Sequence, residues 1–415
     1  IQQREFYALT AFFRNTTENA LDGNVFDPPP ILVVPSDDDR SLWNELRDES
    51  AANQAELADR ADEIDAAFGE WLGLGEYRSL TSPLAESGQW MHLDLDESSR
   101  PRFELGGTVH PVTLEGSVSI APGPGDLPSM RFGDESWAEL PSVPLAGDSP
   151  FSMALWIFRP DSAAGFPVAG QYDAGDGYRG WALSAGGLPS FRLIGDSVPE
   201  SEQRSAARIS PRTTVEGSAQ GQWTHVVVTH DGTAERSGMA IYRDGERLET
   251  GGTEYFAKAL GSSLTDGPLE LGRSVSMREG EQIVRHFPGG GIADFRIFDR
   301  ALTDQEVRVV SAWPTLRRAR DKTPEALTPA ERDALRQYYL AVEDGRYSEL
   351  LARSRELTHE WREVRRRGAI THIMQERTDS EPQAHILYRG MYDQPLDLVT
   401  AGVPSALPPM AASLP

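Results

Sequence analysis

Residues 172–179 contain the side chains of this sequence that are best suited to binding a ligand. The segment reads Tyr172-Asp173-Ala174-Gly175-Asp176-Gly177-Tyr178-Arg179. Exposed aromatic rings stack on sugars, and recognition residues concentrate in loops. The ligand-binding candidates are therefore Tyr172, Asp173, Asp176, Tyr178 and Arg179. The two aspartates could also offer oxygen ligands to calcium, but two carboxylates without a ligand series are better explained as a solvated loop, so the metal is left unassigned.

Motifs of the common catalytic sites are absent from the sequence. The paired-carboxylate pattern E-x-D-x-x-E fails, because Glu63 and Asp65 are followed by Phe68 where the second glutamate is needed. No G-x-S-x-G, P-loop, H-E-x-x-H or EF-hand series occurs. His225 and His230 fall five apart on one predicted strand, so they point to opposite faces and cannot share a metal ion. Whether the protein is an enzyme stays undecided.

Composition excludes further classes of function. The sequence has no cysteine, which excludes thiolate catalysis, Cys-based zinc sites and haem attachment through CxxCH. Its formal charge of −24 opposes non-specific binding to nucleic acid or an anionic membrane. No run of eighteen apolar residues occurs, so no membrane span is expected. The length of 415 residues predicts more than one structural unit, and we expect an internal piece of a larger protein.

Helical patterns stand at both ends of the chain. Residues 1–36 predict a helix and then an extended strap, because Pro28-Pro29-Pro30 ends any helix. Residues 37–72 predict one long amphipathic helix, with apolar residues at heptad spacing. Residues 347–364 predict a second apolar seam. A shorter helix precedes it, capped by Thr328 with Glu331 three residues later.

The two long helices carry opposite charge. Residues 37–65 hold eleven acids and three arginines, whereas residues 351–367 hold six arginines and three glutamates. An antiparallel hairpin would place Asp37–Asp39 beside Arg365–Arg367, with acids at a helix N-terminus and arginines at a C-terminus, as helix dipoles favour. The same model places Trp43 near Trp361. Two separate solvated helices are the alternative.

Between these helices, short apolar runs alternate with Gly, Pro, Asn and Asp. This sequence pattern is typical of an antiparallel β-sandwich. The sequence Asp244-Gly245 predicts a tight hairpin turn, since it supplies the positive φ that a type I′ turn requires. The predicted strands are 151–158, 180–184, 191–194, 223–230, 238–242, 269–271 and 291–298.

An ordered series of motifs in this middle part resembles the laminin-G-like, concanavalin A-type jelly roll. The motifs are Met130-Arg131-Phe132-Gly133, Phe151-Ser152-Met153-Ala154-Leu155-Trp156-Ile157, Gly180-Trp181-Ala182-Leu183, Gln222-Trp223-Thr224-His225-Val226, Ile241-Tyr242-Arg243-Asp244-Gly245, Leu269-Glu270-Leu271-Gly272 and Gly291-Ile292-Ala293-Asp294-Phe295. The resemblance implies a mainly β fold, a jelly-roll sandwich flanked by the antiparallel helical hairpin. It also implies that Trp156, Trp181 and Trp223 fill the sandwich core, and that calcium at the sandwich rim is one interpretation of the acidic loop.

The two ends of the chain resemble a second family. Ile1-Gln2-Gln3-Arg4-Glu5-Phe6-Tyr7-Ala8-Leu9 looks like the end of a planctomycete cytochrome-c-associated domain of unknown function. The start of its usual partner domain is similar to segments 371–376, 385–390 and 402–409. This resemblance implies a periplasmic or otherwise extracytoplasmic protein, in which haem belongs only to an absent cytochrome domain. Glu376, His385 and Arg389 form the polar part of the C-terminal motif, and their role is open.

Together these observations predict five segments. They are 1–36, the end of an N-terminal cytochrome-c-associated domain; 37–83, a helical arm and linker; 84–313, the sandwich; 314–367, the returning arm, which would form a coiled-coil-like seam with the first; and 368–415, the start of a C-terminal domain. The leading hypothesis is a non-catalytic recognition module for a glycan or protein ligand that also contacts its own flanking domains. The alternatives are a targeting module of a polysaccharide-degrading or redox enzyme, and a purely architectural insertion.

Overall fold

The computed structural model describes residues 1–17, 31–84, 88–95, 101–147, 149–160, 165–196, 208–209, 217–232, 238–250, 262–278, 281–378 and 380–408. The chain divides into two compact units. The small unit consists of residues 1–40 and 365–415, and the large unit of residues 41–364. Each unit has its own buried apolar cluster.

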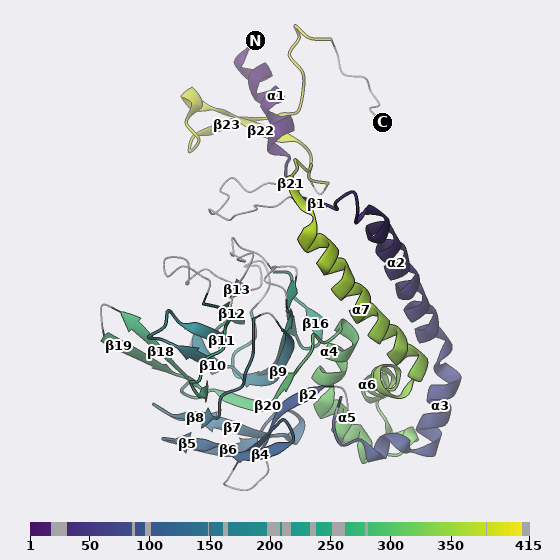
Figure 1. Ribbon diagram of the computed structural model, residues 1–415. Helices are drawn as coiled ribbons and strands as arrows, with labels where there is room; N and C mark the ends of the chain where they lie inside the picture. Colours follow the sequence, from purple (N-terminus) through teal and green to yellow (C-terminus); the bar gives the residue numbers. More distant parts are fainter. Residues whose placement is uncertain are drawn as a thin grey trace. The chain divides into compact units, whose positions relative to one another are not determined.

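The large unit contains a sandwich of two antiparallel sheets (Figure 1). One sheet has seven strands within the described residues, and we name it the open sheet. Its strands in spatial order are β13 (Arg208–Ile209), β12 (Ser190–Ile194), β11 (Arg179–Ala185), β10 (Phe166–Asp173), β17 (Leu269–Leu271), β8 (Trp137–Leu140) and β5 (Thr113–Glu115). A separate hairpin, of β18 (Arg273–Arg278) and β19 (Glu281–His286), follows β17.

The other sheet has ten strands among the described residues, and we name it the helix-backed sheet. Its main path is β16 (Glu246–Arg247), β15 (Met239–Arg243), β14 (Trp223–Asp231), β9 (Pro150–Phe158), β20 (Gly291–Phe298), β2 (Gln89–Asp94), β3 (Arg102–Leu105) and β4 (Thr108–Pro111). In addition β7 (Pro128–Phe132) pairs with β20, and β6 (Val118–Pro122) pairs with β7.

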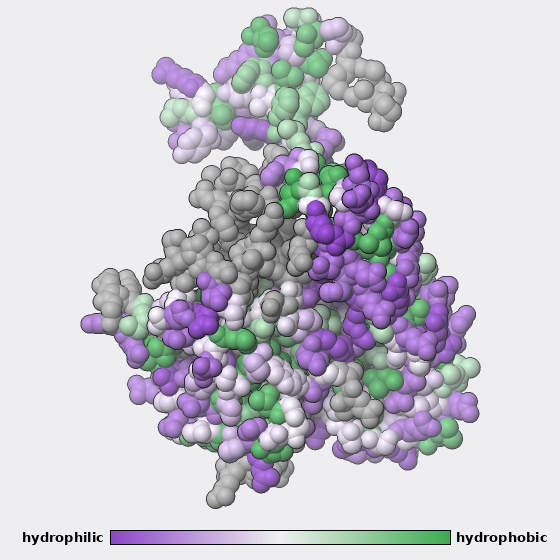
Figure 2. All heavy atoms as spheres, viewed as in Figure 1, coloured by the Kyte–Doolittle hydropathy of each residue, from purple (hydrophilic) through white to green (hydrophobic). Residues whose placement is uncertain are grey.

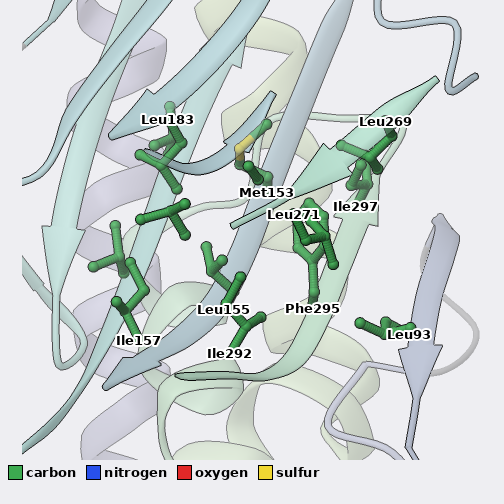
Figure 3. Close-up of a cluster of buried hydrophobic side chains, with 14 of the residues drawn as sticks. Leu93, Met153, Leu155, Ile157, Leu183, Leu269, Leu271, Ile292, Phe295 and Ile297 are labelled. Atoms are coloured by element: carbon green, nitrogen blue, oxygen red, sulfur yellow. The ribbon is translucent and has the colours of Figure 1, made fainter. Parts of the chain in front are cut away.

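The main core lies between the two sheets. Met153, Leu155 and Ile157 of β9 point into it, as do Leu183 of β11 and Leu271 of β17 (Figure 3). Inward residues recur at every second position, which is the period of a strand with one face in the core. The mainly β, jelly-roll fold predicted from the sequence is therefore confirmed.

Helices cover the outer face of the helix-backed sheet. These are α3 (Asp65–Leu74), α4 (Asp304–Ser311), α5 (Trp313–Arg320) and α6 (Pro329–Tyr338). A second apolar cluster joins them to outward residues of the strands, such as Ala154, Val227 and Phe298. Tyr242 also donates a hydrogen bond to Asp304, with an oxygen–oxygen distance of 2.7 Å. The β18–β19 hairpin instead contacts β10 of the open sheet.

The antiparallel helical hairpin is confirmed. In the large unit α2 (Arg40–Glu63) packs against α7 (Gly345–Arg367), and the ring centroids of Trp43 and Trp361 are 4.1 Å apart. The buried Asn53 side chain donates to the Leu350 carbonyl at 3.1 Å. Hydrophilic residues dominate the outer surface of the hairpin (Figure 2), so the apolar seam is its stabilising contact.

The prediction of one unbroken helix over residues 37–72 is wrong at Ile64. This residue separates α2 from α3, with φ −76° and ψ −10°. The Arg336 guanidinium donates to the Ala61 carbonyl, which an unbroken helix would pair with the Asp65 amide. A side chain that inserts into the hydrogen-bond ladder in this way bends a helix.

The small unit contains a helix packed on a two-stranded sheet and a second, separate pair of strands. α1 (Gln3–Arg14) packs on β22 (Gln383–Leu387) and β23 (Pro395–Thr400), while β1 (Ile31–Val34) pairs with β21 (Ala369–His372). Its buried apolar residues are Tyr7, Ala11, Ala384 and Val399. The predicted helix is confirmed and residues 31–34 of the predicted strap are extended, whereas Pro28-Pro29-Pro30 lie outside the described residues. Within this unit Arg367 and Asp39 form the expected ion pair, at 2.6 Å.

The predicted strands and the predicted turn agree with the structure to within a residue or two at each end. Asp244 and Gly245 have φ values of 51° and 88°, as a type I′ turn requires. The prediction for the three tryptophans is only partly right. Trp181 is in the core, but Trp156 lies on the opposite face of its strand and packs against the helices, and Trp223 is half-exposed. The sequence motif shows the strand but not which way its bulky residue points.

Candidate binding face of the sandwich

The five predicted ligand-binding residues lie together at the turn that joins β10 to β11. Tyr172 pairs with Gly180, and Asp173 pairs with Arg179. The turn needs Gly180, because a Cβ there would lie 2.1 Å from the Gln171 carbonyl oxygen. Tyr178 adopts a φ of 65°, an uncommon conformation for a residue with a side chain. The local backbone therefore fixes where these side chains emerge.

The two aspartates are largely used by the turn itself. Asp173 Oδ1 accepts hydrogen bonds from the Gly175 and Asp176 amides, at 2.8 and 3.3 Å. Asp176 Oδ2 accepts from Arg179 Nε at 2.7 Å. No cluster of three or more His, Cys, Asp or Glu side chains able to hold a metal ion occurs in the part of the chain that the structure describes. Calcium at this turn has no further support from the geometry.

The two tyrosines hold the β18–β19 hairpin against the open sheet. The Tyr172 hydroxyl accepts from the Val275 amide at 2.7 Å and donates to the Val275 carbonyl at 3.0 Å. The Tyr178 hydroxyl makes the same pair of bonds to Met277, at 2.6 and 3.2 Å. Burial raises the pKa of Tyr172, so its hydroxyl stays protonated and able to donate. The hydroxyl edges of both rings are therefore occupied by backbone hydrogen bonds. The guanidinium of Arg192 lies 5.6 Å from the Tyr178 ring centre.

A row of outward residues crosses the open sheet beside these tyrosines. Strand register places Glu139 of β8 opposite Glu270 of β17, which faces Gly170 of β10, and then Ala182 and Arg192 follow on β11 and β12. Burial raises the pKa of Glu270, Arg273 opposes that shift, and Glu139 adds to it. The row runs from carboxylates through small residues to a guanidinium.

The sequence interpretation missed these two glutamates. The alternation in Leu269-Glu270-Leu271 contains the signal, since it places Glu270 on the outer face while both leucines face the core. Nothing in the local sequence shows that Glu139 lies on the neighbouring strand. That neighbour relation comes from the fold.

Histidines 225 and 230 lie on opposite faces of β14, as predicted. The His225 ring centroid is 4.9 Å from that of Trp156, on the helix side, and its Nδ1 lies 2.7 Å from Ser311 Oγ. The His230 ring stacks on Phe151 of the main core, at 5.1 Å. They share no site.

The polar residues of the C-terminal motif are in the small unit and do not form one site. Glu376 accepts a hydrogen bond from the buried Asn15 amide at 3.2 Å. His385 Nδ1 lies 2.9 Å from the Leu396 carbonyl oxygen, and the Arg389 guanidinium lies over Tyr388. The Asn15–Glu376 bond joins two segments that are distant in sequence, whereas the contacts of His385 and Arg389 are with residues nearby in sequence.

The arrangement of rings, guanidinium groups and carboxylates on the open sheet suits recognition by stacking and hydrogen bonding. It belongs to a jelly-roll domain, and residues 132–308 match the family model described as the concanavalin A-like lectin/glucanases superfamily, of a laminin G type. This match lies within the predicted sandwich and confirms its laminin-G-like character. It covers less than half of the chain and neither end, so the relationship of residues 1–36 and 368–415 to cytochrome-c-associated domains stays a prediction.

Solved structures resemble the chain only distantly. The binding domain of Paraclostridial Mosquitocidal Protein 1 is 15% identical, with a TM-score of 0.41 over 55% of this chain and 52% of that chain. The binding domain of Botulinum neurotoxin serotype D is 14% identical, with a TM-score of 0.37 over 57% of this chain and 54% of that chain. The chain thus spans about half the length of these structures. No curated protein matches it.

Proposed function

We propose that this chain is a non-catalytic recognition module that binds a glycan or a protein through the outer face of the open sheet. The observation that supports this most is the cluster of Tyr172, Tyr178 and Arg192 on the sheet face that the described helices leave uncovered. The tyrosine ring centroids are 6.2 Å apart. Rings with their hydroxyls held by the backbone are preorganised for stacking, which lowers the entropy lost on binding.

A glycan array probed with the labelled full chain tests this function. Tyr178→Ala should remove binding to the glycans that the parent chain retains, because it deletes the ring. Tyr178→Phe keeps the ring and loses only the hydroxyl contacts to Met277, so it should retain most of the binding. Tyr392→Ala is a matched control, since Tyr392 is an exposed tyrosine of the small unit.

Two results would contradict the proposal for this face. One is glycan binding that Tyr178→Ala leaves unchanged. The other is equal loss of binding in Tyr178→Ala and Tyr178→Phe, which would assign Tyr178 to the clamping of the β18–β19 hairpin alone. An array with no bound glycan would leave a protein ligand, to be tested with the same variants once a partner is purified.

An architectural role is the second candidate, and buried ion pairs favour it. Glu306 of α4 accepts from Arg355 of α7 at 3.2 Å, and Asp231 at the end of β14 pairs with Arg362 of α7 at 2.8 Å. Both carboxylates are almost fully buried. Because these contacts fasten the sandwich to the helical hairpin, the sandwich could serve mainly to brace it. Normal binding by the Tyr178 variants, with loss of hairpin stability when Arg362 is replaced, would support this role.

The wider setting is part of the proposal. We place the module in an extracytoplasmic protein whose ends continue into cytochrome-c-associated domains, with haem only in such a domain. No described helix is both long and apolar enough to cross a membrane. Calcium bound at the 173–179 turn would stabilise the folded chain by mass action, so equal melting temperatures in calcium and in chelator would remove it from the proposal.

A further inference from the structure

An open groove lies at the base of the β18–β19 hairpin, away from the turn that carries the two tyrosines. Its volume is about 580 Å³, within the range of roughly 300–1,000 Å³ typical of small-molecule sites. Three separate chain segments form it: the turn before β8, the start of β10 and the end of β19. The lining residues are Asp134, Glu135, Gly165, Arg285, His286 and Pro288.

The charged side chains that line this groove do not form ion pairs with one another. Asp134, Glu135 and Arg285 form no ion pair with any residue in the described segments. All three are exposed. The groove therefore offers hydrogen-bond acceptors from two carboxylates and donors from a guanidinium, and these groups have no structural partner to stabilise.

Next to the groove, three nitrogen atoms have no hydrogen-bond partner among the residues that the structure describes. They are Trp137 Nε1, Arg273 Nε and His286 Nδ1, and all are buried. The side chains touch, with the Trp137 and His286 ring centroids 5.7 Å apart and the Arg273 guanidinium carbon 4.4 Å from the Trp137 ring. An unpaired buried polar group is destabilising. Because His286 also lines the groove, an oxygen entering beside it would supply a missing acceptor.

The backbone conformation of Glu135 is a further feature of this groove. Its φ of 51° places it in the left-handed region, where residues other than glycine are strained. Glu135 lies in the turn between β7 and β8, and among the described residues its carboxylate forms no ion pair. Strained residues of this kind cluster at sites of ligand contact.

We propose that this groove binds a neutral pyranose residue of a glycan, at a site separate from the tyrosine face. Sugar hydroxyl groups both donate and accept, so one ring can donate to Asp134 and Glu135 and accept from Arg285 and His286. An anionic sugar would be repelled by the two carboxylates, and the net charge of −24 opposes an anionic polymer at longer range. Arg285 lines the same groove as the two carboxylates, so a neutral ring can use all three charged groups at once.

Calorimetric titration of the full chain with cellotriose, mannotriose, xylotriose and trigalacturonate tests this proposal. At least one of the three neutral probes should bind, and trigalacturonate should not. Arg285→Ala and Glu135→Gln should each weaken that binding about tenfold or more, as expected when a hydrogen bond to a charged group is lost. Glu281→Gln, at the other end of β19, and Arg102→Ala, on β3, are the matched controls and should bind normally.

Glu135→Gly separates a binding role from a structural one. Glycine tolerates the positive φ, so this variant should melt at the same or a higher temperature and still lose the neutral sugar. Sugar binding that survives Glu135→Gly and Arg285→Ala would overturn the groove site, while the tyrosine face would stand if Tyr178→Ala abolished binding. Preferred binding of trigalacturonate would overturn the choice of a neutral sugar. No binding of any probe would overturn the groove site, whereas the tyrosine face is judged separately, by the Tyr178 variants on the glycan array.

Discussion

Single buried residues of this protein link its stability to pH. His225 is fully buried between β14 and the helices, and burial lowers its pKa from 6.5 to about 3. Of the charged groups nearby, Asp294 opposes that shift and Arg296 adds to it. The imidazole therefore stays neutral in the folded chain at pH values where an unfolded chain would protonate it.

We predict that this histidine destabilises the chain in acid. Above pH 6.5 this histidine costs no stability, because it is neutral in both states. As pH falls from 6.5 toward 3, the free energy of unfolding decreases, because only the unfolded state takes up the proton there. The slope from one such group is about 1.4 kcal/mol per pH unit. Urea unfolding at a series of pH values should show a shallower dependence for His225→Gln, and the exposed His359→Gln should match the parent. An unchanged slope in His225→Gln would show that carboxylates alone set the acid response.

Some of the candidate binding residues could be chosen from the sequence, and others could not. Tyr172, Asp173, Asp176, Tyr178 and Arg179 could be chosen because they are neighbours in sequence and in a loop. The groove residues could not, since Trp137, Arg273 and His286 meet only through the pairing of β8, β17 and the β18–β19 hairpin. Long-range register of this kind has no local signature.

At the scale of elements, charge and apolar spacing together determined the helical hairpin correctly. Hydrogen bonds from Arg367 and Ser36 hold the pKa of Asp39 below its usual value, and Arg353 of α7 reaches Glu49 of α2 at 2.7 Å. The break at Ile64 could not be predicted, because it depends on Arg336, a residue distant in sequence. Periodicity reports which face of a helix is apolar, but it does not report a competitor for a backbone carbonyl.

We predict that exchanging the charges of Asp39 and Arg367 restores what either single reversal removes. Asp39→Arg or Arg367→Asp alone should destabilise the small unit slightly, as expected for a solvent-screened pair. The double variant should recover part of this loss, and both effects should shrink at high salt. Urea unfolding at low and high sodium chloride measures them. Additive losses in the double variant would mean that the two side chains do not interact in solution.

At the scale of the whole molecule, the two units differ greatly in the size of their buried clusters. Four buried apolar residues form the cluster of the small unit, whereas two extensive clusters fill and back the sandwich. A two-stranded sheet alone is marginally stable, so the small unit depends on the packing of α1 against β22 and β23. The jelly roll was predictable because its strands repeat one alternating pattern, while the small unit offers too few periodic residues for such an argument.

We predict that hydrogen exchange will separate the two units. Amides of α1, β22 and β23 should exchange at lower protection than those of β9, β14 and β20, because local opening of the small unit exposes little apolar area. Mass spectrometry of peptides from the full chain measures this order. Equal protection of both sets would indicate that the small unit gains stability from contacts not represented in its four-residue cluster.

The close contact of the Trp43 and Trp361 rings allows the pairing of α2 and α7 to be followed by spectroscopy. Their ring centroids are 4.1 Å apart and their planes are inclined by 30°. Two indole chromophores at that separation share excitation energy, so their absorption bands couple and give paired circular-dichroism signals of opposite sign. The signal would vanish when α2 and α7 separate, even if each helix stayed intact. This chain thus carries its own spectroscopic reporter of helix pairing, and no attached dye is needed to follow it.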